Sequence, residues 1–195
     1  DRLKRLEFIS RFNPVKLIAG VYVQFVRCTP MLVQIFLIYY IVFGFISLPK
    51  FTFFGFIQFE RFFPGVVALA LNSGGYMSDV IRGGIEGVDL GQTEAARSLG
   101  FNRFQTMFYV ILPQAWRTIL PPVGNECIAM LKDTSLVSVM AMPDLMQRGR
   151  SFAAKTYLYF ETYTIIALIY LIITLVLSKG VSIMEAKLNY YDRKK

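Results

Sequence analysis

Apolar residues gather in four long stretches of the chain, separated by connections rich in charge, glycine and proline. The clearest stretches are residues 31–48 and 162–177, near the roughly 20 apolar helical residues that cross a hydrocarbon core about 30 Å thick. Residues 64–81 are also long enough but contain several polar positions, and residues 106–145 are interrupted by prolines and charges. The pattern therefore predicts four membrane-spanning helical segments.

The composition also indicates a membrane protein. Of the 195 residues, 55% are hydrophobic and 17% charged, and the mean hydropathy is +0.49, which is too apolar for an ordinary soluble domain. The chain has no histidine, which excludes imidazole acid–base catalysis, a Ser-His-Asp triad and a His-ligated metal site. Cys28 and Cys127 are too few for a zinc site, so we predict packing roles for both, with a bridge between them left open.

The basic residues predict how the chain is oriented. The net charge is +8, and its basic residues cluster before residue 31, between residues 82 and 117, and after residue 177. By the positive-inside rule these three regions face the cytoplasm, and so do both chain ends. The connection 146–156 is also basic, but the order of four crossings places it outside. We interpret the charge as an orientation signal and not as a nucleic-acid surface.

Two segments are predicted to lie outside the hydrocarbon core. Segment 1–27 is basic and lacks an apolar core, so we predict that it does not span the membrane. The aromatic tract 51–63 lies between two predicted spans. Because aromatic rings favour the headgroup level, we expect an interfacial belt or a half-inserted helix there, in preference to a ligand platform.

A short cytoplasmic helix with strong end signals is predicted at about residues 90–99. Asp89 and Gln92 fit a capping box at its start, and Gly100 can end it in a left-handed conformation. Asn102 with Gln105 can start the next helix. A helix of about ten residues is unstable alone in water, so we expect it to dock on a partner, the alternative being a solvated connection. The predicted docking residues are Glu94, Ala95, Ala96, Arg97, Leu99 and Gly100.

Ionisable residues inside the fourth apolar stretch are the main candidates for a binding site. Glu126, Lys132 and Asp133 are costly at lipid depth unless they face protein, water or a ligand. Helical spacing places Glu126 and Asp133 on one face, with Asn125 and Lys132 beside them. Two acids and one base leave a surplus negative charge, which favours a ligand- or water-lined face over an internal ion pair.

This combination of charges suits a free amino acid, which carries an ammonium and a carboxylate group. Asp133 or Glu126 would bind the ammonium, and Lys132 or Arg82 would bind the carboxylate. Four residues are expected to break the helix before this site and expose its backbone: Pro113, Pro121, Pro122 and Gly124. A second polar stripe either lines the path or packs closely on a neighbour, and it consists of Asn72, Gly75, Tyr76 and Asp79.

Several motifs together resemble the membrane subunits of binding-protein-dependent ABC importers. Glu94-Ala95-Ala96 followed by Gly100 and by the run VILP at 110–113 is similar to the EAA signature of that family. The run RCTPMLVQ at 27–34 resembles the RGTPLLVQ element of its polar amino-acid branch, with Cys28 in place of glycine. Residues 72–84 resemble the third-span pattern of this branch. Residues 124–136 resemble its GNEF and LLKDTSL patterns, with Cys127 in place of phenylalanine.

The resemblance implies an all-α, multi-spanning transmembrane permease of the type I ABC importer (MetI-like) fold. It forms one domain over residues 1–195, in a prokaryotic inner membrane. Because the family normally has five spans, a further span is expected before Asp1.

The resemblance also implies the partners. The helix around Glu94 would sit in a cleft of an ABC ATP-binding subunit. That subunit would bind ATP and Mg²⁺, since this chain has no GxxxxGK loop, is not an enzyme and is expected to need no cofactor or metal of its own. A second permease subunit, identical or homologous, and an extracytoplasmic binding protein complete the expected complex.

The implied cargo is a polar amino acid, and the surplus acid at Glu126 favours a cationic one such as arginine. Two rival functions stay open. One is an ion-coupled secondary carrier with Glu126, Lys132 and Asp133 as its relay, which transport by this chain alone under an ion gradient would select. The other is a membrane scaffold whose short helix recruits a cytoplasmic protein, which complex formation without solute flux would select.

Overall fold

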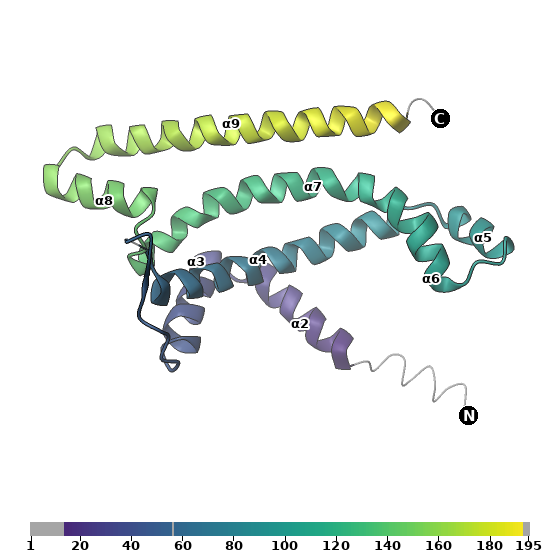
Figure 1. The fold of residues 1–195 in the computed structure, drawn as a ribbon, viewed down its shortest axis with the longest axis horizontal. Coiled ribbons are helices and arrows are strands. Elements are labelled where there is room, and N and C mark those ends of the chain that lie inside the picture. Colours follow the sequence, from purple (N-terminus) through teal and green to yellow (C-terminus); the bar gives the residue numbers. More distant parts are fainter. Residues whose placement is uncertain (1–13, 56, 193–195) are drawn as a thin grey trace.

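The computed structural model describes residues 14–55 and 57–192, and helices dominate it (Figure 1). Several basic residues used to predict the orientation lie outside these residues, namely Arg2, Lys4, Arg5, Arg11, Arg193, Lys194 and Lys195. In chain order the elements are α2 (Pro14–Cys28), α3 (Met31–Phe36), the π-helix η1 (Leu37–Val42), strands β1 (Thr52–Phe53) and β2 (Ile57–Gln58), α4 (Phe59–Glu86), α5 (Leu90–Ser98), α6 (Arg103–Gln105), the π-helix η2 (Thr106–Ile111), α7 (Leu112–Asp133), the 3-10 helix η3 (Thr134–Met140), α8 (Leu145–Thr156) and α9 (Tyr159–Asp192).

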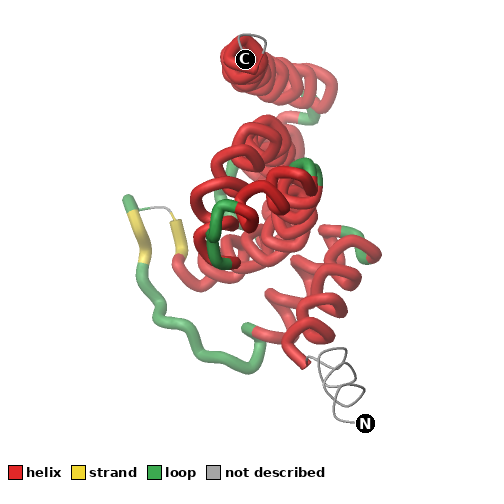
Figure 2. Tube along the Cα trace, turned by 90° about the vertical axis from the view of Figure 1, so that its right-hand side faces the viewer, coloured by secondary structure: helices red, strands yellow, loops and turns green. Residues whose placement is uncertain are grey.

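Three long helices, α4, α7 and α9, form the body of the molecule, and α7 contacts both of the others (Figure 1). Helix α2 packs on α4, and α8 folds back along α9. In Figure 2, α9 lies at one edge of the bundle, while the connection to the β1–β2 hairpin loops out at the side. Helices α5 and α6 share one end of the molecule with the start of α2 and the end of α9, in agreement with the predicted orientation.

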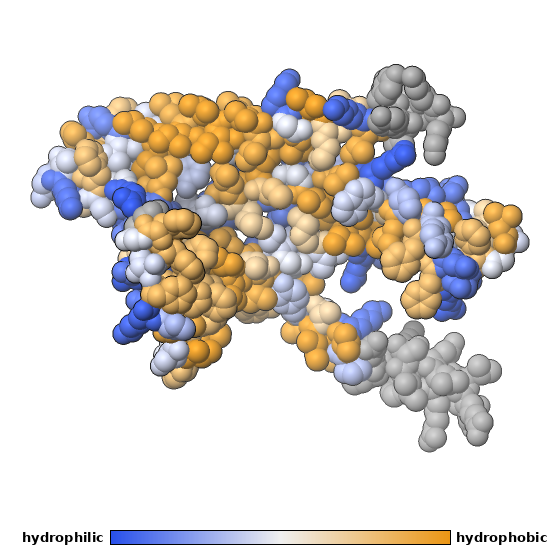
Figure 3. All heavy atoms as spheres, in the orientation of Figure 1, coloured by the Kyte–Doolittle hydropathy of each residue, from blue (hydrophilic) through white to orange (hydrophobic). Residues whose placement is uncertain are grey.

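Glycines allow the long helices to approach closely. Gly84 of α4 faces Ile119 of α7, and any Cβ at this position would overlap the isoleucine side chain. Gly124 of α7 faces α9 in the same way, because a Cβ there would lie 2.7 Å from Val181 Cγ2. Small residues at helix interfaces are typical of membrane bundles, where close backbone contact replaces the hydrophobic effect. Figure 3 shows apolar side chains along the lengths of the helices and hydrophilic ones gathered toward the two ends.

Within the described chain, one helical stretch, Tyr159–Leu188, is by itself long and apolar enough to cross a membrane. It includes the predicted span 162–177. Pro14–Cys28 and Met31–Val42 qualify together as a second span, bent by 117°. Residues 14–28 thus belong to a candidate span or re-entrant loop, in contrast to the prediction that segment 1–27 does not span the membrane. That prediction rested on the basic residues of segment 1–27 as a whole, whereas the ten residues between Lys16 and Arg27 contain one strongly polar side chain, Gln24. The spans predicted within α4 and across η2, α7 and η3 stay predictions.

The backbone differs from the expected shape at two further places. Helix α7 continues through Pro121, Pro122 and Gly124 as one curved helix (Figure 1). Proline removes one hydrogen bond and bends a helix, and packing on both α4 and α9 holds the remaining turns together. In place of a half-inserted helix, the described residues of the tract 51–63 form the small β1–β2 hairpin and the first turn of α4, where the rings of Phe51 and Phe59 stack 4.6 Å apart; the interfacial belt stays a prediction.

The cysteines are not packing residues within the chain. Cys28 and Cys127 are both free and exposed, so the structure contains no bridge between them. The Gln24 side-chain amide donates a hydrogen bond to Cys28 Sγ at 3.1 Å. A small apolar core does form elsewhere, where Ile35 and Ala68 meet Val137 and Met140. It joins α3, α4 and η3 near the end of the molecule opposite α5.

The Gly84 contact yields a stability prediction. Gly84→Ala would force a methyl group into Ile119 and should lower the free energy of unfolding by about 1–3 kcal/mol. Gly83→Ala is the matched control, because a Cβ at Gly83 has no neighbour within 4 Å. Thermal unfolding in detergent should therefore separate the two variants. Equal unfolding temperatures would contradict the close contact of α4 with α7.

Candidate functional site

The short helix predicted from its end signals is present as α5, but its start differs from the prediction. Asp89 is the N-cap, and its carboxylate accepts a hydrogen bond from the Gly91 backbone N–H at 2.6 Å. The expected Asp89–Gln92 capping box does not form, because the Gln92 side chain turns toward α7. Its Oε1 accepts a hydrogen bond from Gln114 Nε2 at 3.2 Å. Residue spacing could not reveal this tertiary contact.

The end of α5 agrees with the prediction. Gly100 has φ +86°, the left-handed conformation expected of a helix-ending glycine. The Phe101 N–H bonds to the Ala96 carbonyl at 3.1 Å and the Gly100 N–H to the Arg97 carbonyl at 3.0 Å, which together form a Schellman motif. The predicted Asn102–Gln105 capping box follows at once, with both bonds at 2.9 Å. The corner between α5 and η2 is therefore tightly defined.

Most of the predicted docking residues are exposed. Glu94, Ala95, Arg97, Leu99 and Gly100 all face outward, whereas Ala96 is 4% exposed and packs within the chain. Two further large apolar side chains at this end, Leu90 and Phe104, are each 78% exposed. They were missed, although large apolar residues in a polar connection are a recognisable signal of a contact surface. Their engagement with a partner stays a prediction.

A cleft of about 660 Å³ lies beside α5, between the α4–α5 connection and the start of α7. Its lining is polar and includes Asp89, Gln92, Gln114 and Arg117. The Gln92–Gln114 hydrogen bond joins α5 directly to α7 at this place. The cleft does not include the predicted binding residues Glu126 and Asp133, so it is separate from the intramembrane charges.

The ionisable residues predicted to lie at lipid depth are on α7. Glu126 and Asp133 are half-buried, while Asn125 and Lys132 are exposed. Within the described chain, no hydrogen bond or salt bridge joins these four side chains to one another, nor to Arg82, which is exposed on the last turns of α4. Among the described residues, Lys132 and Asp133 interact electrostatically but form no salt bridge, so a closed ion pair does not account for these charges. Their role in binding stays a prediction.

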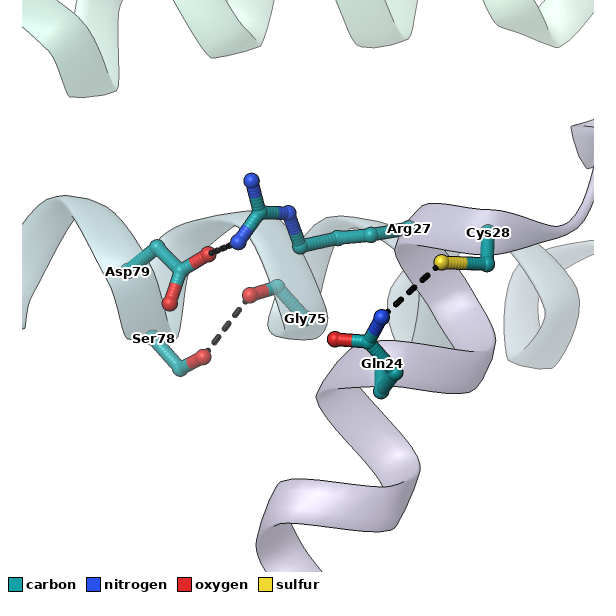
Figure 4. A network of polar contacts seen from close by, with 6 residues as sticks. All are labelled: Gln24, Arg27, Cys28, Gly75, Ser78 and Asp79. Atoms are coloured by element: carbon teal, nitrogen blue, oxygen red, sulfur yellow. Dashed lines mark hydrogen bonds and ion pairs between the residues drawn. The ribbon is translucent and has the colours of Figure 1, made fainter.

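The second polar stripe, on α4, serves helix packing. Asn72 is 8% exposed, and its Nδ2 donates to Gln34 Oε1 at 2.9 Å. Gly75 faces Val26, where an added Cβ would lie 2.7 Å from Cγ1. Asp79 accepts a hydrogen bond from Arg27 at 2.7 Å (Figure 4). Of the two interpretations left open for this stripe, these contacts support close packing, and they bring the motif at 27–34 onto the motif at 72–84.

Gly100 provides a test of the α5 corner. Gly100→Ala should destabilise the left-handed backbone by about 1–2 kcal/mol, even though the structure leaves open space around this position. Amide hydrogen exchange of α5 should therefore become faster. Gly20→Ala in α2, where a Cβ also meets nothing within 4 Å, should leave exchange of α5 unchanged. Unchanged exchange in the Gly100 variant would contradict the Schellman motif.

Comparison with known proteins places this geometry among transport proteins. Residues 7–190 match the family described as binding-protein-dependent transport system inner membrane component. The chain is 36% identical over 181 residues to the probable glutamine ABC transporter permease protein GlnM of Bacillus subtilis, covering 93% of this chain and 79% of the relative. It is 38% identical to the arginine transport system permease protein ArtQ of the same organism, covering 94% of this chain and 80% of the relative.

Further similarity is found in Escherichia coli and among solved structures. The glutamine transport system permease protein GlnP of strain K12 is 38% identical over 161 residues, with 83% of this chain and 70% of the relative covered. The solved structure described as an amino acid ABC transporter with histidines is 45% identical. The superposition covers 92% of this chain and 79% of the chain in the solved structure, and its TM-score is 0.79.

Proposed function

Because this chain belongs to the family of binding-protein-dependent transport system inner membrane components, we propose that it forms the path through which an ABC importer moves a polar amino acid. It is a permease subunit and not an enzyme, with the all-α permease fold that its motifs predicted. As an inner-membrane component, it works with a substrate-binding protein and an ATP-binding subunit. The identity of these partners and the number of membrane crossings belong to the proposal.

The nature of the substrate is supported by what the relatives share. Their names refer to glutamine and to arginine, and the similar solved structure was described with histidines. These amino acids differ in their side chains but have the same ammonium and carboxylate groups. We assign the ammonium to Glu126 or Asp133 and the carboxylate to Lys132 or Arg82. Asn125 lies beside them, and the surplus acid favours a cationic amino acid such as arginine.

The single observation that carries the coupling part of the proposal is the exposed and tightly capped helix α5. Both of its ends are fixed by hydrogen bonds within the chain, while Glu94, Arg97 and Leu99 face outward. A nine-residue helix held this way is suited to receive force from a docked protein. We propose that the partner is the ATP-binding subunit, which would bind ATP and Mg²⁺, and that α5 transmits its movement to α4 and α7.

The wider assembly follows from the exposed surfaces. Glu126 and Asp133 have no partner charge bonded to them within the described chain, so we propose that a second permease subunit, identical or homologous, completes the path at this face. Four crossings of the prokaryotic inner membrane, one of them begun by α2, place α5 inside. The β1–β2 hairpin and α8 then lie outside, where a binding protein would deliver the substrate.

Charge reversal on α5 tests the docking. Glu94→Arg should abolish co-purification of the ATP-binding subunit and leave the amount of permease in the membrane fraction unchanged. Glu86→Arg is the matched control, because Glu86 is exposed at the same end of the molecule but lies on α4. Undiminished co-purification with the Glu94 variant would refute docking through this helix. Loss in both variants would show that the effect depends on charge alone.

Removal of the half-buried acid tests the binding site. Glu126→Ala should weaken binding of labelled arginine or glutamine to the assembled complex by about tenfold or more, since hydrogen bonds to charged groups contribute about 1.5–3 kcal/mol. Assembly should not change, because Glu126 makes no bond within the described chain. Glu161→Ala, at the exposed start of α9, is the control. Unchanged affinity and uptake would place the site elsewhere.

A further inference from the structure

The bend between α2 and α3 is held by one side chain. The two helices meet at 117°, and the break leaves the carbonyls at the end of α2 without a helical partner. Gln34, on the first turns of α3, reaches back across the break. Its Nε2 lies within hydrogen-bond distance of the Val26 carbonyl at 2.9 Å, the Thr29 carbonyl at 3.0 Å and Thr29 Oγ1 at 2.8 Å, so its two hydrogens are shared among three acceptors. One amide therefore satisfies the backbone on the other side of the bend.

The same glutamine joins the bend to α4. Gln34 Oε1 accepts the hydrogen bond from Asn72 Nδ2 at 2.9 Å, and the two residues are only 3% and 8% exposed. A hydrogen bond between buried groups is costly to break, because each polar atom would lose its partner without gaining water. Asn72 was a predicted substrate ligand, but its amide nitrogen is engaged within the chain.

Two further contacts fasten α2 along α4. Arg27 and Asp79 form an ion pair at 2.7 Å, with their side chains 54% and 35% exposed (Figure 4). Tyr22 donates from its hydroxyl to the carbonyl of Leu71, the residue directly before Asn72. An exposed ion pair contributes little to the free energy of unfolding. We therefore expect the Arg27–Asp79 pair to act by fixing the position of α2 on α4.

Helix α4 leads directly to α5. Only residues 87–89 separate the two helices, and the Gly87 N–H still bonds to the Gly83 carbonyl at 2.9 Å. A movement of α5 must therefore displace the end of α4. Whether α2 and α3 follow depends on the bonds that fasten them to α4.

We propose that the Gln34–Asn72 hydrogen bond and the Arg27–Asp79 ion pair make the bent α2–α3 unit move with α4 and α5 during transport. This inference rests on the proposed transport function. It makes Gln34 and Asn72 positioning residues that couple ATP hydrolysis to movement of the spans. Without these bonds the docked α5 still moves, but part of its displacement is lost between α4 and α2.

The test compares ATP consumption with transport in the assembled complex, reconstituted in vesicles and supplied with labelled arginine or glutamine. Asn72→Leu removes the bond to Gln34 and leaves the Gln34 contacts across the bend intact. We expect the ATP hydrolysed per amino acid transported to rise about threefold or more. Substrate affinity should not change, because Asn72 acts through position and not through contact.

Thr162→Val is the matched control. Thr162 is also a buried polar residue, 7% exposed, and its hydroxyl bonds to the Leu158 carbonyl at 2.6 Å, far from α2. The control should keep the wild-type ratio of ATP to transport. An equal rise in both variants would overturn the proposal, and so would an unchanged ratio with Asn72→Leu. Weakened affinity for the amino acid would show that Asn72 is a ligand and would also overturn it.

The exposed Arg27–Asp79 ion pair provides a second test. Substitutions at these more exposed residues should disturb folding less than a substitution at the buried Asn72. Arg27→Asp and Asp79→Arg should each raise the same ratio, and the two together should restore it by exchanging the charges. A double variant as poorly coupled as the single ones would contradict the positioning role. A wild-type complex without ATP-dependent uptake would instead count against the proposed transport function, which separates the two failures.

Discussion

The structure depends on how helices hold together in a solvent that does not favour burying apolar surface. Lipid is as apolar as leucine, so helices in a bilayer gain little by covering each other's apolar side chains. Close backbone approach and interhelical hydrogen bonds must provide the contacts instead. Gly84 against Ile119 and Gly124 against Val181 provide the first kind, and Gln34 with Asn72 provides the second. The large exposed apolar surface of α9 is compatible with the same solvent.

Polar residues of the bundle accordingly divide into two groups. Those on α2, α3 and the middle of α4 bond to one another and fix the helix arrangement. Those on α7, Glu126 and Asp133 above all, make no such bonds within the described chain and stay available to a ligand or a partner. This division separates a set of helices held in place by hydrogen bonds from the face of α7 that the proposed function assigns to substrate binding. Helix α5 is attached to these helices through α4 and to that face through α7.

The sequence predicted the features whose causes are local. The end of α5 at Gly100 and the capping box from Asn102 to Gln105 need only neighbouring residues, and both formed as expected. The motifs also predicted the family and its fold. Predictions failed where distant contacts decide the outcome. Gln92 bonds to Gln114 and not to its own helix end, and Asn72 bonds to a residue 38 positions away. Proline spacing likewise could not show that two flanking helices keep α7 continuous.

The two attachments of α5 determine what kind of motion it can cause. Helix α4 leads into α5, the Gln92–Gln114 hydrogen bond joins α5 to α7, and near that end Gly84 and Ile119 bring α4 and α7 into close contact. A push on α5 acts on both helices at once, near a point where they cannot be pressed closer. The pair should therefore tilt together as one rigid body. A small shift at the α5 end is then carried along both helices and displaces their far ends sideways.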